Sequence, residues 1–258
     1  MNVLQELCSL RCADAEARSA TLPLAELEHR IASMPAAKDF AAAFLPGHGP
    51  RVISELKKAS PSKGLIREDF RPPELAAELV EAGAAALSVL CEPHRFLGDE
   101  NYIRQIRTAT PIPILYKDFV TTPYQVAAAR ASGADAVLLI VAALEPDMLT
   151  ALLDCAHSHG LQALVETHTD EEARIAVDCG ARIVGVNCRD LKTFHTDPAI
   201  TANLIQRFPR NVVKIAESGI RTADDIALLL AAGANGFLIG ETLMRAASPG
   251  AALRQLLS

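Results

Sequence analysis

The chain has 258 residues, half of them apolar, which is enough for one large core or two small ones. Its formal net charge of −6 and the lack of a basic block argue against nucleic-acid binding, whereas a small anion site needs only local positive charge. The N-terminus shows no signal peptide, the longest apolar run (136–144) is too short for a membrane span, and the cysteines lack zinc-ligand spacing. We therefore expect a cytoplasmic protein that binds no metal and no membrane.

The first 48 residues carry a helical pattern and no strand pattern. Apolar residues recur at helical spacing in two groups: Leu4, Leu7 and Leu10, then Leu24, Leu27 and Ile31. Prolines and glycines at 46–50 then interrupt the pattern. We expect residues 1–48 to form an N-terminal helical extension that packs on a catalytic domain, 49–258, within a single domain overall.

The catalytic domain opens with a short apolar run at 52–53, which predicts a buried strand that is broken at Pro61 because proline lacks the N–H of a central strand. Glu55 and Lys57 are two residues apart, so their side chains lie on the same face of that strand. Taken alone, this segment fits a solvated strand end as well as a functional pair.

A glycine followed by alanine recurs along the rest of the chain, each time after a helical stretch and before an apolar run. The four copies begin at Gly83, Gly133, Gly180 and Gly233. Glycine suits the left-handed position that follows a helix. Further apolar runs at 112–116, 162–165 and 212–216 bring the predicted strands to eight, and helices are predicted at 73–81, 124–131, 148–157, 171–178 and 223–231.

Strands that are apolar on both faces and alternate with amphipathic helices indicate a parallel sheet covered by helices. Eight such units in this length favour an α/β protein of the closed (β/α)₈ TIM-barrel class. An open doubly wound sheet is the alternative. It usually carries a G-x-G-x-x-G turn after its first strand, and this chain has none.

Charged and amide side chains follow six of the predicted strands. In a barrel of this class the carboxyl ends of the strands face the catalytic mouth, so solvated strand ends alone do not explain six of them. Lys57 and Lys117 are candidate acids and Glu166 is a candidate base, with Glu55 and Asn187 placed to orient them.

The turns after the last two predicted strands are typical of a phosphate site. One offers a hydroxyl and a glycine turn with free N–H groups, and the other opens a short helix whose N-terminus favours an anion. We predict that phosphate contacts Ser60, Glu217, Ser218, Gly219, Gly240 and Glu241. Phe96 and Phe119 fit core positions as well, but both follow strand ends, which favours an aromatic pocket for a ring.

These segments together resemble the indole-3-glycerol phosphate synthase family of tryptophan biosynthesis, from about Leu4 to the C-terminus. The most diagnostic piece is Glu55-Leu-Lys57-Lys-Ala-Ser60-Pro-Ser-Lys-Gly64, joined by Lys117-Asp-Phe119, Asn187-Cys-Arg189-Asp-Leu and Ala216-Glu217-Ser218-Gly219-Ile220. The resemblance implies closure of the indole ring from 1-(2-carboxyphenylamino)-1-deoxyribulose 5-phosphate, an anionic phosphosugar, with loss of CO₂ and water and without a cofactor. We expect a monomer that can associate with other enzymes of the pathway.

The resemblance further implies residue roles. Lys117 would protonate the substrate ketone, and Glu166 would be the base of the dehydration. Lys57, braced by Glu55, would hold the substrate carboxylate, and it is also a candidate for a second acid. Asn187 and Arg189 would position the substrate. The anthranilate ring would be enclosed by Phe96, Phe119, Leu138 and Ile140.

Two positions depart from the family pattern. Cys188 stands where a second asparagine is usual, and Asp99 stands where a serine is common. Two rival functions stay open: another phosphosugar barrel enzyme, either an isomerase or a Schiff-base aldolase, and a barrel that binds a sugar phosphate without catalysis. An aldolase would be trapped by borohydride, and the isomerase normally needs a cysteine after the first strand, which is absent here.

Overall fold

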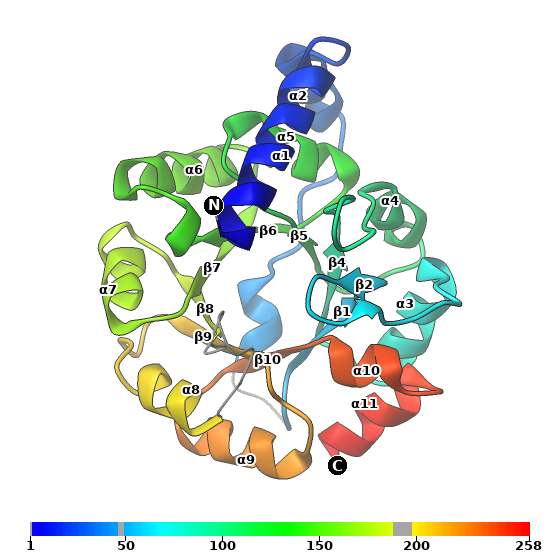
Figure 1. The fold of residues 1–258 in the computed structure, drawn as a ribbon, viewed down its shortest axis with the longest axis vertical. Helices are drawn as coiled ribbons and strands as arrows, with labels where there is room; N and C mark the ends of the chain where they lie inside the picture. Colours follow the sequence, from blue (N-terminus) through cyan, green and yellow to red (C-terminus); the bar gives the residue numbers. More distant parts are fainter. Residues whose placement is uncertain (1, 46–48, 188–197) are drawn as a thin grey trace.

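The computed structural model describes residues 2–45, 49–187 and 198–258. Within them, parallel strands close into a barrel in the order β1-β10-β9-β8-β7-β6-β5-β4, and β4 pairs back onto β1 (Figure 1). The strands are β1 (Val52–Leu56), β4 (Ala86–Leu90), β5 (Ile114–Lys117), β6 (Ala136–Ile140), β7 (Gln162–Thr167), β8 (Ile183–Asn187), β9 (Val213–Glu217) and β10 (Gly236–Ile239). The predicted eight-stranded barrel is confirmed.

Helices alternate with the strands and surround the barrel (Figure 1). They are α3 (Pro72–Glu81), α4 (Asn101–Arg107), α5 (Pro123–Ser132), α6 (Pro146–Ser158), α7 (Asp170–Asp178), α8 (Pro198–Ile205), α9 (Ala223–Ala231), α10 (Glu241–Arg245) and α11 (Pro249–Leu257), with a 3₁₀ turn η2 (Val141–Ala143) after β6. The predicted glycine ends are also present: Gly133 follows α5 with φ of 99°, which a residue with a side chain rarely adopts. No described helix is long and apolar enough to cross a membrane.

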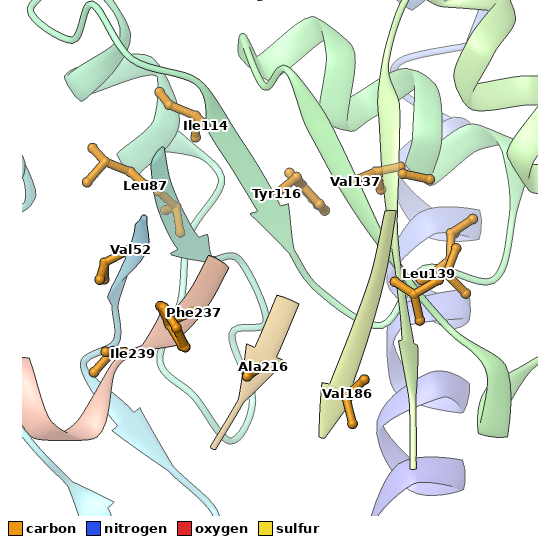
Figure 2. Close-up of a cluster of buried hydrophobic side chains, with 14 of the residues drawn as sticks. Val52, Leu87, Ile114, Tyr116, Val137, Leu139, Val186, Ala216, Phe237 and Ile239 are labelled. Carbon is orange, nitrogen blue, oxygen red and sulfur yellow. The ribbon is translucent and has the colours of Figure 1, made fainter. Parts of the chain in front are cut away.

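The barrel strands serve two cores because successive side chains point to opposite faces. Outward residues such as Val52, Tyr116 and Phe237 pack against the helices (Figure 2). Inward residues such as Ile53 and Leu115 fill the barrel itself. The same alternation carries inward from Ile53 to Glu55 and from Leu115 to Lys117, which lifts polar side chains to the mouth above an apolar floor.

The N-terminal extension touches both ends of the barrel. It forms α1 (Val3–Ser19), α2 (Leu24–Ala32) and the 3₁₀ turn η1 (Ala41–Phe44). Phe40 and Phe44 are buried in the barrel interior at the amino ends of the strands, with ring centroids 5.2 Å apart. A Cβ at Gly236, the first residue of β10, would lie 2.6 Å from the Phe44 ring. The extension therefore closes the floor of the barrel and shares its core.

A short hairpin interrupts the connection after β1. Strands β2 (Ala59–Ser60) and β3 (Gly64–Leu65) pair antiparallel, with Ser60 opposite Gly64. The predicted break at Pro61 is thus a turn of a hairpin that the sequence pattern did not indicate. This hairpin carries Ser60 and Lys63 to the rim of the mouth.

Candidate active site

A cavity of about 1010 Å³ lies at the carboxyl ends of the strands, and the first turn of α1 forms part of its wall. All the predicted site residues that the structure describes line it: Glu55, Lys57, Ser60, Phe96, Lys117, Phe119, Leu138, Ile140, Glu166, Asn187, Glu217, Ser218, Gly219, Gly240 and Glu241. Arg189 and Cys188 lie outside the described residues. Residues from separate strands therefore converge on one space, as the alternation of the barrel strands predicts.

Lys117 sits at the centre of the charged groups in this cavity. Its Nζ lies 3.0 Å from Oε2 of Glu166 and 3.1 Å from Oε2 of Glu217. Burial alone would lower the pKa of Lys117, but these two carboxylates, with Glu55, raise it well above its usual range. Lys117 is therefore an ammonium group at neutral pH and has a proton to deliver.

The two carboxylates beside Lys117 have opposite environments. Oε1 of Glu166 accepts a hydrogen bond from Nδ2 of Asn187 at 3.0 Å. Burial alone would raise the pKa of Glu166, but Lys117 and His168 outweigh it and lower this pKa. Burial raises the pKa of Glu217 to about 7, and the nearby charges of Glu166 and Glu55 add to the rise. Oε1 of Glu217 is buried without a hydrogen-bond partner among the described residues. Glu166 is thus a firmly held anion, and Glu217 is the carboxyl that takes a proton readily.

A second ion pair flanks this group on the side of β1. Nζ of Lys57 lies 2.6 Å from Oε2 of Glu55, and both side chains are largely buried. The pairing confirms that Glu55 and Lys57 lie on one face, as their spacing predicts. It also holds a second ammonium group at the mouth of the cavity.

The turn after β9 has the backbone expected for anion binding. Ser218 and Gly219 both have left-handed φ angles, 64° and 76°. The backbone N–H groups of a turn can line a concave anion site. Lys63, Arg221 and Arg245 also line this end of the cavity. The charge of this end therefore suits a phosphate group.

Comparison with known proteins agrees with this geometry. A family model described as indole-3-glycerol phosphate synthase matches residues 4–256. The chain belongs to the indole-3-glycerol phosphate synthase family. Indole-3-glycerol phosphate synthases of Rhodococcus opacus (strain B4) and Rhodococcus jostii (strain RHA1) are each 45% identical to it over 259 residues, covering 100% of this chain and 96% of theirs. As a member of the family it is a carboxy-lyase of tryptophan biosynthesis.

Solved structures share the barrel at much lower identity. A 3-hexulose-6-phosphate synthase superposes with a TM-score of 0.66 at 16% identity, covering 80% of this chain and 97% of that one. A thiamine phosphate pyrophosphorylase from Pyrococcus furiosus superposes with a TM-score of 0.59 at 17% identity, covering 80% and 93%. At such identities the likeness supports the fold and nothing about chemistry.

An aromatic pair lines the apolar side of the synthase cavity. The ring centroids of Phe96 and Phe119 are 6.0 Å apart with 43° between the ring planes, and Leu138 and Ile140 of β6 are buried and line the same cavity. The loop that carries Phe96 is fixed by Glu92, a fully buried carboxylate that accepts backbone N–H groups of residues 94, 95 and 96. The predicted pocket for a ring thus has a rigid support that sequence reasoning missed.

Two contacts at or beside the synthase site escaped the sequence analysis. Arg11 of α1 donates Nε and Nη2 to the buried carboxylate of Asp118, at 2.9 and 2.7 Å, next to Lys117 in the chain. His168 faces Oε1 of Glu166 from the end of β7 at 3.3 Å. For Arg11 no local pattern signals the contact, whereas His168 lies two residues after a candidate base and that position was a usable signal.

Proposed function

We propose that the cavity binds 1-(2-carboxyphenylamino)-1-deoxyribulose 5-phosphate and converts it to indole-3-glycerol phosphate, with Lys117 as the general acid. The observation that carries this proposal is the position of the Lys117 ammonium group, buried between two carboxylates in an apolar-walled cavity. Such a group delivers a proton to a substrate oxygen in a space that excludes most water.

Ring closure is the first step. The aromatic carbon that bears the carboxylate attacks the ketone carbon, and Lys117 gives its proton to the ketone oxygen as the carbon–carbon bond forms. The Lys57 ammonium group, braced by Glu55, holds the substrate carboxylate. Loss of CO₂ then restores the aromatic ring, and the apolar surround of Phe96 and Phe119 favours it because a neutral product replaces an anion.

Dehydration is the last step. Glu166 removes a proton from the CH₂ group that lies between the ring nitrogen and the carbon bearing the new hydroxyl, and the hydroxyl leaves as water with a proton from an ammonium group. The proton on Glu166 can return to Lys117 directly, since the two groups are 3.0 Å apart. Lys57, which also lines the cavity and pairs with Glu55, is the candidate for the second acid. Asn187 orients Glu166 and, with Arg189, positions the substrate.

The substrate phosphate occupies the end of the cavity that is formed by the turns after β9 and β10. We assign it to the hydroxyls of Ser60 and Ser218 and to the backbone of Gly219, Gly240 and Glu241. The anthranilate ring lies against Phe96, Phe119, Leu138 and Ile140. Glu217, grouped with the phosphate turn by sequence, has its carboxylate on Lys117 and takes part in proton chemistry through that contact.

The test is a Lys117→Met variant assayed for indole absorbance and fluorescence. The protein background is low because the chain has no tryptophan. We expect turnover to fall by about 10²-fold or more while substrate binding changes little. Lys214→Met is the matched control, because Lys214 lies on β9 and does not line the cavity. Near wild-type turnover of Lys117→Met would remove the assignment.

We propose further that the protein is a single-domain cytoplasmic monomer that can associate with other tryptophan-pathway enzymes. The five cysteines in the described parts of the chain are free, which suits a reducing compartment. The extension 1–48 and the barrel 49–258 share one core through Phe40 and Phe44, which supports a single domain. Sedimentation equilibrium tests the monomer, and a dimer at assay concentration would contradict it.

A further inference from the structure

His168 lies between two carboxylates at the edge of the active site. Its Nε2 is 3.3 Å from Oε1 of Glu166, and its Nδ1 is 3.1 Å from Oε2 of Glu172 in the first turn of α7. The same Glu172 oxygen accepts the backbone N–H of His168 at 2.7 Å. The imidazole is largely buried, with 13% of its side chain exposed. Both ring nitrogens and the backbone N–H of His168 are therefore held by carboxylates.

This arrangement selects the charged form of the ring. A neutral imidazole has one donor and one acceptor nitrogen, and ionised carboxylates only accept. Only the imidazolium satisfies both neighbours. Burial alone would lower the pKa of His168, but Glu166 and Glu172 raise it to about 10. The charged groups that act on it come from β7 and α7, and Lys117 of β5 acts through Glu166.

The imidazolium of His168 can compensate the negative charge of Glu166 when Lys117 has lost its proton. Lys117 is shared between Glu166 and Glu217, and Glu55 also acts on it. When Lys117 passes its proton to the substrate, it becomes neutral and these carboxylates lose their common cation. His168 is a second cation on Glu166, and no proposed step removes its proton. It can keep Glu166 ionised and in place at the moment when Lys117 cannot.

We propose that His168, held as an imidazolium by Glu172, is a positioning residue that fixes Oε1 of Glu166 and keeps Glu166 an anion while Lys117 gives its proton to the substrate ketone. The proposal deepens the proposed function and rests on the assignment of Lys117 and Glu166. Glu172 is also a positioning residue, because it acts on Glu166 only through the imidazolium of His168. A cation beside Glu166 also makes it a weaker proton holder, so it returns its proton to Lys117 after the dehydration.

The first test compares His168→Leu with His168→Gln. Leucine removes both the charge and the hydrogen bond, whereas glutamine keeps a neutral N–H donor for Glu166. We expect kcat of His168→Leu to fall by about 10- to 100-fold, the scale of a misplaced catalytic group, with KM little changed. His168→Gln should recover part of this loss. His29→Gln is the matched control, because His29 is an exposed residue of α2, and this variant should leave kcat unchanged.

The second test separates charge from structure through Glu172→Gln. The amide oxygen of glutamine still accepts the backbone N–H of His168, so the start of α7 is preserved. With one carboxylate neutralised, the imidazolium loses its proton at lower pH. We expect the alkaline fall in kcat to move down by about one pH unit or more, the usual effect of one nearby charge. A uniform loss at all pH values would show a structural role only and would overturn the proposal.

A direct measurement does not depend on any variant. The ¹⁵N shifts of His168 in the intact protein at pH 8 should show both ring nitrogens protonated. A neutral ring at this pH overturns the proposal. If Lys117→Met keeps its turnover, the proposed function fails. If Lys117→Met is inactive while His168→Leu keeps its kcat, only the role of His168 fails.

Discussion

Gly240 lies directly against the carboxylate of Glu55: a Cβ at Gly240 would be 2.1 Å from Oε2 of Glu55, far inside any real contact of a Cβ atom. That oxygen is the one that pairs with Nζ of Lys57 at 2.6 Å. Any side chain at residue 240 must therefore displace the carboxylate that braces Lys57. The glycine after β10, to whose backbone we assign a phosphate contact, thus also makes room for the ion pair.

The first prediction follows from this contact. Gly240→Ala should push Glu55 away and free Lys57, so kcat falls by about 10²-fold, the usual cost of a displaced catalytic group. Gly160→Ala is the control, because the Cβ added at Gly160 would meet open space, and its left-handed φ of 76°, unlike the φ of −121° at Gly240, adds only backbone strain. The control should lose about 1 kcal/mol of stability and keep its turnover. Equal loss of activity in both variants would contradict the argument.

A second glycine makes room for Glu217. A Cβ at Gly185 on β8 would lie 2.0 Å from Oε1 of Glu217. Gly185→Ala should therefore lower kcat by moving Glu217 off Lys117. In a Glu217→Ala background the same glycine change should cost no more than about threefold, because the two sites share one interaction. Steady-state kinetics of the four proteins test this, and effects that multiply would show that Gly185 acts elsewhere.

The third prediction concerns stability and pH. The folded protein raises the pKa of Glu217 from 4.5 to about 7, so between these values the folded state holds a proton that the unfolded state has lost. Stability contributed by this group is present below pH 4.5 and is lost as pH rises toward 7. Glu166 has a lowered pKa and acts below that window.

Glu217→Gln removes this titration. The free energy of unfolding of the wild type, measured by urea relative to Glu217→Gln, should decrease across the window by on the order of 1–3 kcal/mol. A constant difference between the two proteins would mean that Glu217 does not hold its proton in this range.

The fourth prediction concerns the anchor of α1. The carboxylate of Asp118 is fully buried and paired with Arg11, and the hydroxyl of Tyr116 donates to it at 3.1 Å. Arg11→Met leaves a buried charge without its cation, so we expect a loss of about 3–5 kcal/mol in urea unfolding. Arg30→Met is the control, because its pair with Glu26 is exposed and is worth about 0.5 kcal/mol at most.

Adding Asp118→Asn to Arg11→Met should recover much of the stability, because the buried charge disappears. A double variant as unstable as Arg11→Met would place the loss in packing of the arginine stem. Turnover of the single variant at low temperature reports whether α1 also steadies Lys117, the neighbour of Asp118 in the chain.

The sequence by itself determined the barrel, its helices and most residues of the candidate site. Buried strands alternate their side chains and helices end at left-handed glycines, so local patterns such as Gly133 with its following apolar run predict the order of elements. The alternation also predicts that Glu55, Lys117 and Glu166 point inward at the same end. These properties depend on backbone geometry and burial over a few residues, which a single chain displays directly.

Only the tertiary structure decided which charged groups meet. Lys117 and Glu217 are 100 residues apart in the chain, and Arg11 and Asp118 are 107 apart. Whether such tips lie 3 Å or much farther apart depends on how the strands are staggered on closure and on which rotamers the packed core allows. For the same reason, only the folded structure shows that His168 lies between Glu166 and Glu172 and that Phe40 and Phe44 close the floor of the barrel.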